Sequence, residues 1–364
     1  MLLIRLVAGV IGFAVVAAVV ASAIRSFVLP RSVRDRVAQW VFRLVWLVFQ
    51  PFTHAGLPYA RRDRTLALYA PVSLLVLPAA WLTLVWIGYA AMYWALGVEP
   101  WQSTLVLSGS SLFTLGFYQP PNPVVTTLVF SEAALGLLLV ALLIAYLPTM
   151  YGAFARRETA VTLLEVRAGS PPTALELIER FHRLKRFDHL HELWEQWEQW
   201  FAELEESHTS LAALVFFRSP HPARSWVNAA GAVMDAAALA ASSLDIPRDA
   251  QADLCIRAGY LALRHIADFF GVQYTARPQP GDPISISRAE FDAACAHLQE
   301  RNVPIRGDRE QAWRDFSGWR VNYDTVLFAL ARITTAPEAP WISDEARQRW
   351  ARDRQPAARQ GAFR

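Results

Sequence analysis

The sequence predicts an all-α protein in which transmembrane helices are followed by an α-helical soluble domain. Long uncharged runs occupy the N-terminal part of the chain, which has 364 residues and is 54% hydrophobic. The remainder has the apolar periodicity of amphipathic helices, and no run of note alternates as a strand would. A transmembrane helix needs about 20 predominantly apolar residues, a length that the runs reach. We therefore expect a membrane part with an appended soluble part.

Charge is unevenly distributed along the chain. Residues 1–155 carry nine arginines and four acids, a net charge of +5, whereas the remainder carries 26 basic and 28 acidic residues, a net charge of −2; together these give the formal +3 of the chain. The positive excess lies beside the apolar runs, where it sets the orientation of membrane spans. No nucleic-acid partner is expected. Cys255 and Cys295 lack CxxC spacing, so neither a disulfide framework nor a thiolate zinc site is indicated.

The first apolar run, Leu6 to Ile24, has 19 residues and is just long enough to span a bilayer. A signal peptide is the alternative, because Ala21-Ser22-Ala23 resembles a cleavage site. Arg5 alone precedes the run, whereas seven arginines follow it between positions 31 and 64. This asymmetry favours an uncleaved span with the N-terminus outside and residues 31–64 inside.

The next apolar segment, Val37 to Phe52, contains Arg43 near its middle and Trp40 and Trp46 along its length. Tryptophan and an arginine that snorkels suit the interface of a bilayer. We expect this segment to lie in the cytoplasmic interface, with an ordinary buried helix as the alternative. Residues 1–64 are thus predicted to form an anchor helix and an interfacial helix.

The stretch Trp101 to Pro121 lies between two longer apolar segments. The uncharged run Leu66 to Gly97, cleanest from Ala79 to Leu96, predicts an outer helix, and Val124 to Leu147 predicts a helix that returns. Thirteen residues from Trp101 to Phe113 would rise only about 20 Å as a helix, against a hydrocarbon core of roughly 30 Å. The stretch is therefore predicted to be re-entrant. A short buried helix and turn without a pore is the alternative.

From about Thr65 to Glu158 the chain resembles potassium channels of the bacterial two-transmembrane, pore-loop type. In that family a pore helix precedes a filter that reads T-V-G-Y/F-G-D, and an inner helix with a central glycine follows. The match in kind covers the first four filter positions: Thr114, Leu115, Gly116 and Phe117. Tyr118 and Gln119 replace the second glycine and the acid. Gly136 lies at the hinge position, and Arg156 and Arg157 lie at the cytoplasmic exit of the inner helix.

The resemblance implies a homotetrameric monovalent cation channel in the inner membrane of a bacterium, with a cytoplasmic C-terminal domain that regulates gating. Its partners would be the lipid bilayer and K⁺ or Na⁺, with no cofactor. Backbone carbonyls of Thr114 to Tyr118 would replace the hydration shell of the ion, and the dipole of the pore helix would favour cations. Because a left-handed conformation costs a residue with a Cβ about 1–2 kcal/mol, Tyr118 predicts weak selectivity. The alternative is a non-conducting membrane scaffold or sensor that keeps the pore-loop fold.

Two residues of the predicted inner helix are candidates for gating or pore support. Glu132 is its only ionisable group, and because a charge inside a membrane is costly, it is expected to face protein or water. This carboxylate would attract cations or brace the loop; alternatively, it is protonated and hydrogen-bonded to the loop backbone. Gly136 is either a gating hinge or a site of close helix packing.

The pore domain is predicted to cover residues 65–157, a cytosolic α-helical domain residues 158–334, and a flexible tail residues 335–364. Helical periodicity runs from Ala174 to Glu206 and from Asp249 to Phe270. Metal-binding spacing occurs in Asp188, His191, Glu192 and Glu195. A solvated face beside an apolar stripe explains these four residues better. No phosphate loop, nucleophile elbow or triad spacing appears, so neither catalytic residues nor a metal site, and hence no enzyme, are expected.

Overall fold

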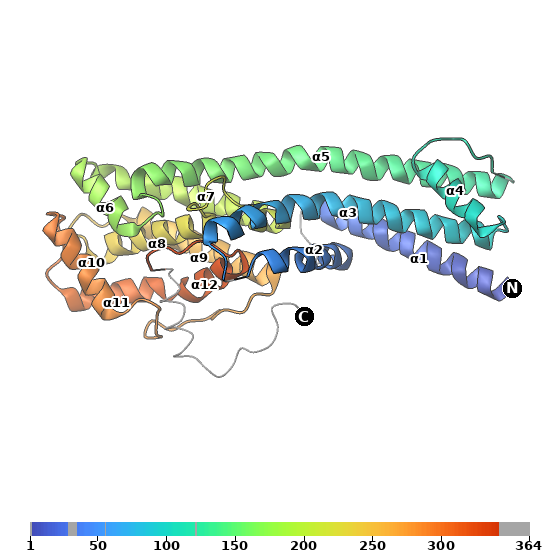
Figure 1. The fold of residues 1–364 in the computed structure, drawn as a ribbon. Helices are drawn as coiled ribbons and strands as arrows, with labels where there is room; N and C mark the ends of the chain where they lie inside the picture. The colour runs from blue at the N-terminus through green and yellow to red at the C-terminus, as the bar shows by residue number, and fades with distance from the viewer. Residues whose placement is uncertain (1, 28–34, 55, 121, 342–364) are drawn as a thin grey trace. The chain divides into compact units, whose positions relative to one another are not determined.

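The computed structural model describes residues 2–27, 35–54, 56–120 and 122–341, and the regular elements of these residues are helices (Figure 1). The all-α prediction is confirmed for them. Two compact units are formed: the first contains the described residues up to Gly152 together with Ser210–Leu214, and the second contains Ala153–Thr209 and the described residues from Val215 onward. Arg31, Arg34 and Pro121, which entered the topology prediction, lie outside the described residues.

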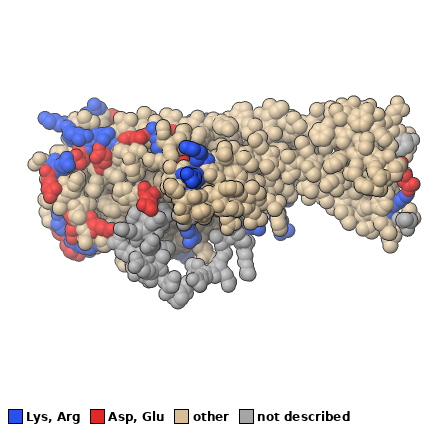
Figure 2. Space-filling model, viewed as in Figure 1, with Lys and Arg blue, Asp and Glu red and all other residues tan. Residues whose placement is uncertain are grey.

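Three of the described helices are long and apolar enough to cross a membrane. They are α1 (Leu2–Phe27), α3 (Tyr59–Ala95) and α5 (Pro123–Ala168). At about 1.5 Å per residue, each is longer than a hydrocarbon core of roughly 30 Å. The visible surface over the long helices of the first unit is almost free of charged residues between the two ends of these helices (Figure 2). The chain is therefore a membrane protein by the length and composition of these helices.

Helices α1 and α3 pack antiparallel, and small residues allow them to approach closely. A Cβ at Gly12 would lie 2.4 Å from the carbonyl oxygen of Gly88, so only glycine fits at this crossing. Farther along α1, the Nε1 of Trp81 donates a 3.0 Å hydrogen bond to the hydroxyl of Ser22. At the other end, Arg5 forms an ion pair with Glu99, just beyond α3. The N-terminus of α1 and the C-terminal end of α3 therefore lie together.

Helix α2 (Arg36–Phe49), followed by the 3₁₀ turn η1 (Gln50–Phe52), packs against α3 on one face only. The side chain of Asp35 caps its first turn by accepting from the backbone N of Ala38 at 2.9 Å. Trp40, Leu44 and Leu47 are exposed on its other face. Apolar residues thus lie on both its packed and its exposed face, and the interfacial position of α2 stays a prediction.

Two internal prolines do not interrupt α3, which runs through Pro71 and Pro78. The short helix α4 (Trp101–Leu112) follows, and α5 then continues about 20 residues beyond Leu147, where the predicted inner helix ends. A hydrophobic stretch thus identifies where a helix can cross a bilayer, but the helix itself ends where capping or backbone geometry ends it.

The second unit is built around α8 (Trp226–Ser243), a helix rich in alanine that is buried on all sides. An all-round apolar helix is expected to be enclosed by others. The described helices of this unit besides α8 and the end of α5 are α6 (Ala174–Arg183), η2 (Phe187–His189), α7 (Leu190–Ser210), α9 (Ala250–Phe270), α10 (Arg288–Glu300), α11 (Arg309–Arg320) and α12 (Asp324–Ile333). Helices α6, α9, α11 and α12 pack directly on α8. The remaining short turn, η3 (Ala212–Phe216), follows α7.

Capping residues set several helix boundaries of the second unit. Ser287 and Glu290 form a reciprocal capping box at the start of α10, and Thr173 accepts from the backbone N of Glu176 at 3.0 Å to start α6. The predicted helical stretch from Ala174 to Glu206 is divided because Lys185 adopts a left-handed conformation, φ 54°, between α6 and η2. Backbone strain of this kind leaves no signal in apolar periodicity.

The chain from position 335 to 341 packs on the second unit. Ala336 and Ala339 are buried, and Asn228 of α8 donates a 2.9 Å hydrogen bond to the carbonyl oxygen of Pro337. The predicted tail over 335–364 therefore begins among residues that contact the core, and its remaining positions lie outside the described residues.

Candidate functional site

The candidate site is the loop that follows α4 in the first unit. At the end of α4 the backbone N of Leu115 bonds to the carbonyl of Ser110 at 2.8 Å and that of Thr114 to the carbonyl of Ser111 at 2.9 Å. This pair of bonds is a Schellman motif, which needs a left-handed residue, usually glycine, at its centre. Thr114 takes that position with φ 55°. The first predicted filter residue is therefore also the residue that ends the helix.

The loop beyond Thr114 is open to its surroundings. Leu115 and Phe117 are 62% and 65% exposed. Gly116 adopts φ 71°, and a Cβ there would meet no atom within 4 Å. Glycine is therefore favoured at this position by the left-handed backbone conformation and not by a lack of space for a side chain. Tyr118 is half-buried and does not have a positive φ. The left-handed residues of this described loop are thus Thr114 and Gly116.

Serines of α4 hold the loop and the helix in place. The hydroxyl of Ser110 accepts from the backbone N of Phe117 at 3.2 Å, and the hydroxyl of Ser111 donates to the carbonyl oxygen of Val129 on α5 at 2.7 Å. Ser108, Ser110 and Ser111 are all buried. Sequence reasoning missed these three residues. The signal was the Ser-Gly-Ser-Ser run inside an otherwise apolar helix, where hydroxyls must find internal partners.

Glu132 lies at the meeting point of α3, α4 and α5. It is completely buried and accepts hydrogen bonds from the hydroxyl of Tyr93, at 2.7 Å, and from Ser108. Ser108 also lies 2.9 Å from the carbonyl oxygen of Trp86. The recorded partners of Glu132 are thus side chains of the flanking helices and not the loop backbone. A carboxyl so placed can fix α4 between α3 and α5.

Gly136 lies one helical turn farther along α5, against the end of α4. A Cβ at this position would lie 2.4 Å from the carbonyl oxygen of Leu112, closer than real Cβ atoms approach. Helix α5 continues through this residue without a break. The contact explains why a glycine is needed here in this conformation, since any larger residue would push α4 and α5 apart.

The acidic and histidine residues singled out in the second unit do not converge. His191 pairs with Asp249 at 3.0 Å, whereas Glu192 pairs with His189 at 2.9 Å and Asp188 lies in the preceding turn. No group of three or more possible metal ligands occurs among the described residues. The structure thus places His191 and Glu192 in different ion pairs, and Asp188 contacts the same histidine as Glu192.

The strongest polar cluster of the second unit was not predicted at all. Arg320 of α11 is fully buried and pairs with Asp235 of α8 and with Asp324 of α12, the latter at 2.9 Å. Tyr323 donates to Asp235 at 2.9 Å, and Ser285 donates to Asp324 at 2.6 Å. Arg320 and Asp324 are four residues apart, but Asp235 is far from both in sequence, so spacing along the chain could not reveal that all three meet.

Comparison of the whole chain with protein-family models, curated proteins and solved structures found no match.

Proposed function

We propose that the protein is a monovalent cation channel in which four copies surround a pore lined by Thr114, Leu115, Gly116, Phe117 and Tyr118. The observation that carries this proposal is the form of α4. Its 12 residues rise only about 18 Å, too little to cross a bilayer, and they end in an exposed loop that serines hold to the helix. Exposed backbone at membrane depth is tolerated where it lines a water-filled path, and carbonyl rings there can replace the hydration of an ion.

The exposed apolar residues of the first unit support assembly into a symmetric oligomer. Phe113, Leu115 and Phe117 are each more than half exposed, as are Phe130 and Leu137 on α5. Exposed apolar side chains of a membrane-spanning unit face lipid or a neighbouring subunit, and we assign those of the loop to contacts between subunits. One chain supplies one loop, so a ring of carbonyls needs several copies around an axis. The family resemblance makes that number four.

We place the channel in the inner membrane of a bacterium, with the N-terminus of α1 outside and the second unit in the cytoplasm, where it would regulate gating. The antiparallel packing of α1 and α3 agrees with this topology, because it brings Arg5 and Glu99 to the same end. The arginines between α1 and α3, and Arg156 and Arg157 on α5, would then face the cytoplasm, as the positive-inside rule requires.

Selectivity for potassium over sodium is expected to be weak. Tyr118 stands where the resemblance places a second left-handed glycine, and it does not adopt that conformation. The hydroxyl of Ser110 holds the loop through Phe117 at 3.2 Å, in place of the carboxylate that Gln119 lacks. Fewer ordered carbonyls in series discriminate less between two monovalent cations.

The reversal potential under bi-ionic potassium and sodium in planar bilayers tests this proposal. Tyr118→Gly combined with Gln119→Asp should raise potassium selectivity, whereas Tyr118→Phe, which keeps the Cβ, is the matched control and should leave it unchanged. A wild type that already strongly prefers potassium would contradict the role given to Tyr118. A wild type that conducts neither ion would contradict the channel itself.

A non-conducting scaffold or sensor with the same fold is the second candidate. The observation that favours it is the position of Thr114, whose left-handed φ and Schellman bonds end a helix in the ordinary way and need no ion. Flux of potassium and of sodium into liposomes containing the purified protein separates the two. Flux above that of protein-free liposomes supports the channel, and its absence for both ions supports the scaffold.

A further inference from the structure

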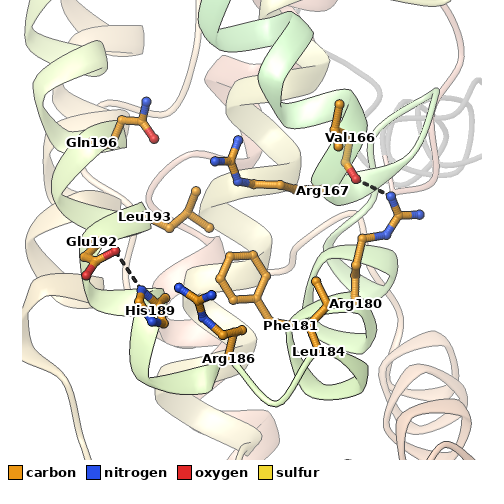
Figure 3. Close-up of a pocket in the computed structure, with 10 residues that line it drawn as sticks. All are labelled: Val166, Arg167, Arg180, Phe181, Leu184, Arg186, His189, Glu192, Leu193 and Gln196. Atoms are coloured by element: carbon orange, nitrogen blue, oxygen red, sulfur yellow. Dashed lines mark hydrogen bonds and ion pairs between the residues drawn. The ribbon is translucent and has the colours of Figure 1, made fainter.

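A pocket of about 300 Å³ lies in the second unit, between the end of α5, the helix α6 and the start of α7 (Figure 3). Three arginines and one histidine contribute to its wall, against a single acid, Glu192. The volume is at the lower end of the range for small-molecule sites. The pocket is independent of the loop after α4, and neither the channel nor the scaffold proposal uses it.

The acids near the pocket already have partners. Glu192 accepts from His189 at 2.9 Å, and Asp188 lies 3.3 Å from the same imidazole. Glu176 forms an ion pair with Arg180. The negative charges around the pocket are therefore engaged, which leaves Arg167 and Arg186 as the cations of the wall without an acidic partner among the described residues.

The guanidinium groups of these arginines have N–H donors that are not used in hydrogen bonds within the described residues. Arg186 has no recorded side-chain partner in the described part of the chain, and Arg167 has one, the carbonyl oxygen of Leu163 on its own helix at 3.1 Å. The Nε of Arg180 is buried without a hydrogen-bond partner, although its other nitrogens bond to Glu176 and to the carbonyl of Val166. The guanidinium of Arg180 is thus directed to the carbonyl of Val166, and Arg167 and Arg186 are the arginines with donors left for an anion (Figure 3).

Apolar side chains lie between the two free arginines. Figure 3 shows Leu193 and the ring of Phe181 between the guanidinium groups of Arg167 and Arg186. Leu184 and Val166 add exposed apolar surface at the edge. A free inorganic anion would leave this surface unused, whereas an anion attached to an aromatic or apolar body would cover it.

We propose that this pocket binds a small soluble phosphate monoester with an aromatic or apolar body. The planar guanidinium fork of arginine matches the geometry of phosphate oxygens, and two such groups in the lining of one pocket supply the positive charge that a dianion requires. The exposed side chains of Val166 and Leu184 at the edge of the pocket hold the body of the ligand. The ligand would stabilise the arrangement of α5, α6 and α7 that forms the pocket.

Calorimetric titration of the full chain in phosphatidylcholine nanodiscs tests the proposal with three probes. AMP should bind at least tenfold more tightly than adenosine, which lacks the phosphate, and than inorganic phosphate, which lacks the body. Arg167→Gln and Arg186→Gln should each weaken AMP binding about tenfold, because each removes a charge-assisted hydrogen bond. Arg257→Gln, at an exposed arginine of α9, is the matched control and should bind AMP as the wild type does.

Several results would overturn the proposal. Equal affinity for AMP and adenosine would show that the phosphate is not recognised. Equal affinity for AMP and inorganic phosphate would show that the apolar residues of the pocket do not contribute to binding. Equal losses of AMP affinity in Arg186→Gln and Arg257→Gln would show that binding depends on the net charge of the protein and not on Arg186 itself. Nanodiscs that also contain phosphatidic acid distinguish a lipid headgroup from a soluble ligand: weaker AMP binding there would assign the pocket to lipid and contradict a soluble ligand. None of these outcomes depends on ion conduction.

Discussion

Glu132 in the first unit and Asp235 and Asp324 in the second are all buried, but they are stabilised by different partners. Glu132 receives hydrogen bonds from the hydroxyls of Tyr93 and Ser108, and no cation contacts it among the described residues. Asp235 and Asp324 share the guanidinium of Arg320. A buried carboxyl needs either neutral donors or a paired charge, since burial of an unpaired charge costs far more than either. The two units use one solution each.

The charge balance of the second cluster is maintained by its neighbours. Burial alone would lower the pKa of Arg320, but Asp235 and Asp324 raise it above its usual value, so the guanidinium stays charged. Burial and the nearby Asp235 raise the pKa of Tyr323 well above the usual value, so its hydroxyl remains a donor. The cluster therefore holds a charged guanidinium at its centre and a neutral phenol at its edge.

The largest effect is expected from removal of the shared cation. Arg320→Met leaves two buried carboxylates without their counter-charge and should destabilise the second unit by about 3–5 kcal/mol. Thermal unfolding of the purified chain in detergent, followed by tryptophan fluorescence, measures the loss. The matched control adds Asp235→Asn and Asp324→Asn to Arg320→Met and should recover most of it, because neutral groups need no counter-charge. An equally unstable triple variant would show that packing, and not charge, sets the cost.

In the first unit, the corresponding test asks whether Glu132 stabilises the fold as a hydrogen-bond acceptor or through its charge. Glu132→Leu leaves the hydroxyl of Tyr93 without its acceptor, while Ser108 can still donate to the carbonyl of Trp86, and should cost about 1–3 kcal/mol. Glu132→Gln keeps an acceptor oxygen and should cost clearly less, whereas Arg320→Gln in the second unit should remain strongly destabilising. The same thermal measurement compares all three. If Glu132→Gln is as damaging as Glu132→Leu, the carboxyl of Glu132 is held by charge, and the contrast between the units fails.

Packing in the first unit can be probed beside the same cluster. Gly136→Ala places a methyl group 2.4 Å from the carbonyl oxygen of Leu112 and should destabilise the contact of α4 with α5 by about 1–3 kcal/mol. Gly109→Ala is the matched control, since a Cβ there meets Trp86 at an ordinary 3.5 Å. A lower melting temperature for Gly136→Ala alone is the expected result. Unchanged stability in both variants would point to a conformation in which α5 moves away from α4.

Elements that depend on local composition were predictable from the sequence. The expected short helix from Trp101 to Phe113 is α4, Trp101–Leu112, and the apolar run Leu6 to Ile24 lies within α1. Length and hydropathy are sufficient for such segments. The all-α class and the presence of membrane-spanning candidates followed for the same reason.

Features that depend on tertiary contacts were not predictable. Arg320 and Asp324 have the i,i+4 spacing of a local ion pair, but nothing in the sequence indicates that Asp235 of α8 meets them. The interaction of Glu132 with Tyr93 likewise needs the packing of α5 on α3. The pocket containing Arg167 and Arg186 arises only when a left-handed turn at Lys185 separates α6 from η2. A single sequence records periodicity within an element but not the pairing of distant side chains.

The smallest expected effect comes from His208, a buried group of the second unit that lies beside a cation and is still neutral. Its Nε2 lies 3.1 Å from Arg157, so this nitrogen accepts and the proton is on Nδ1, near Ser207. Burial, and then the charge of Arg157, lower the pKa of His208 well below its usual value of 6.5. Below pH 6.5 the imidazole therefore binds a proton in the unfolded chain but not in the folded unit, and the contribution of His208 to stability decreases by up to about 1.4 kcal/mol per pH unit as the pH falls.

Thermal unfolding at pH 7.5, 6.5 and 5.5 should show this decrease in the wild type and a smaller one in His208→Gln. His221→Gln, at an exposed histidine, is the control and should retain the wild-type slope. Equal slopes in the wild type and His208→Gln would mean that the imidazole accepts the proton without loss, and that a neutral partner beside Arg157 is not required.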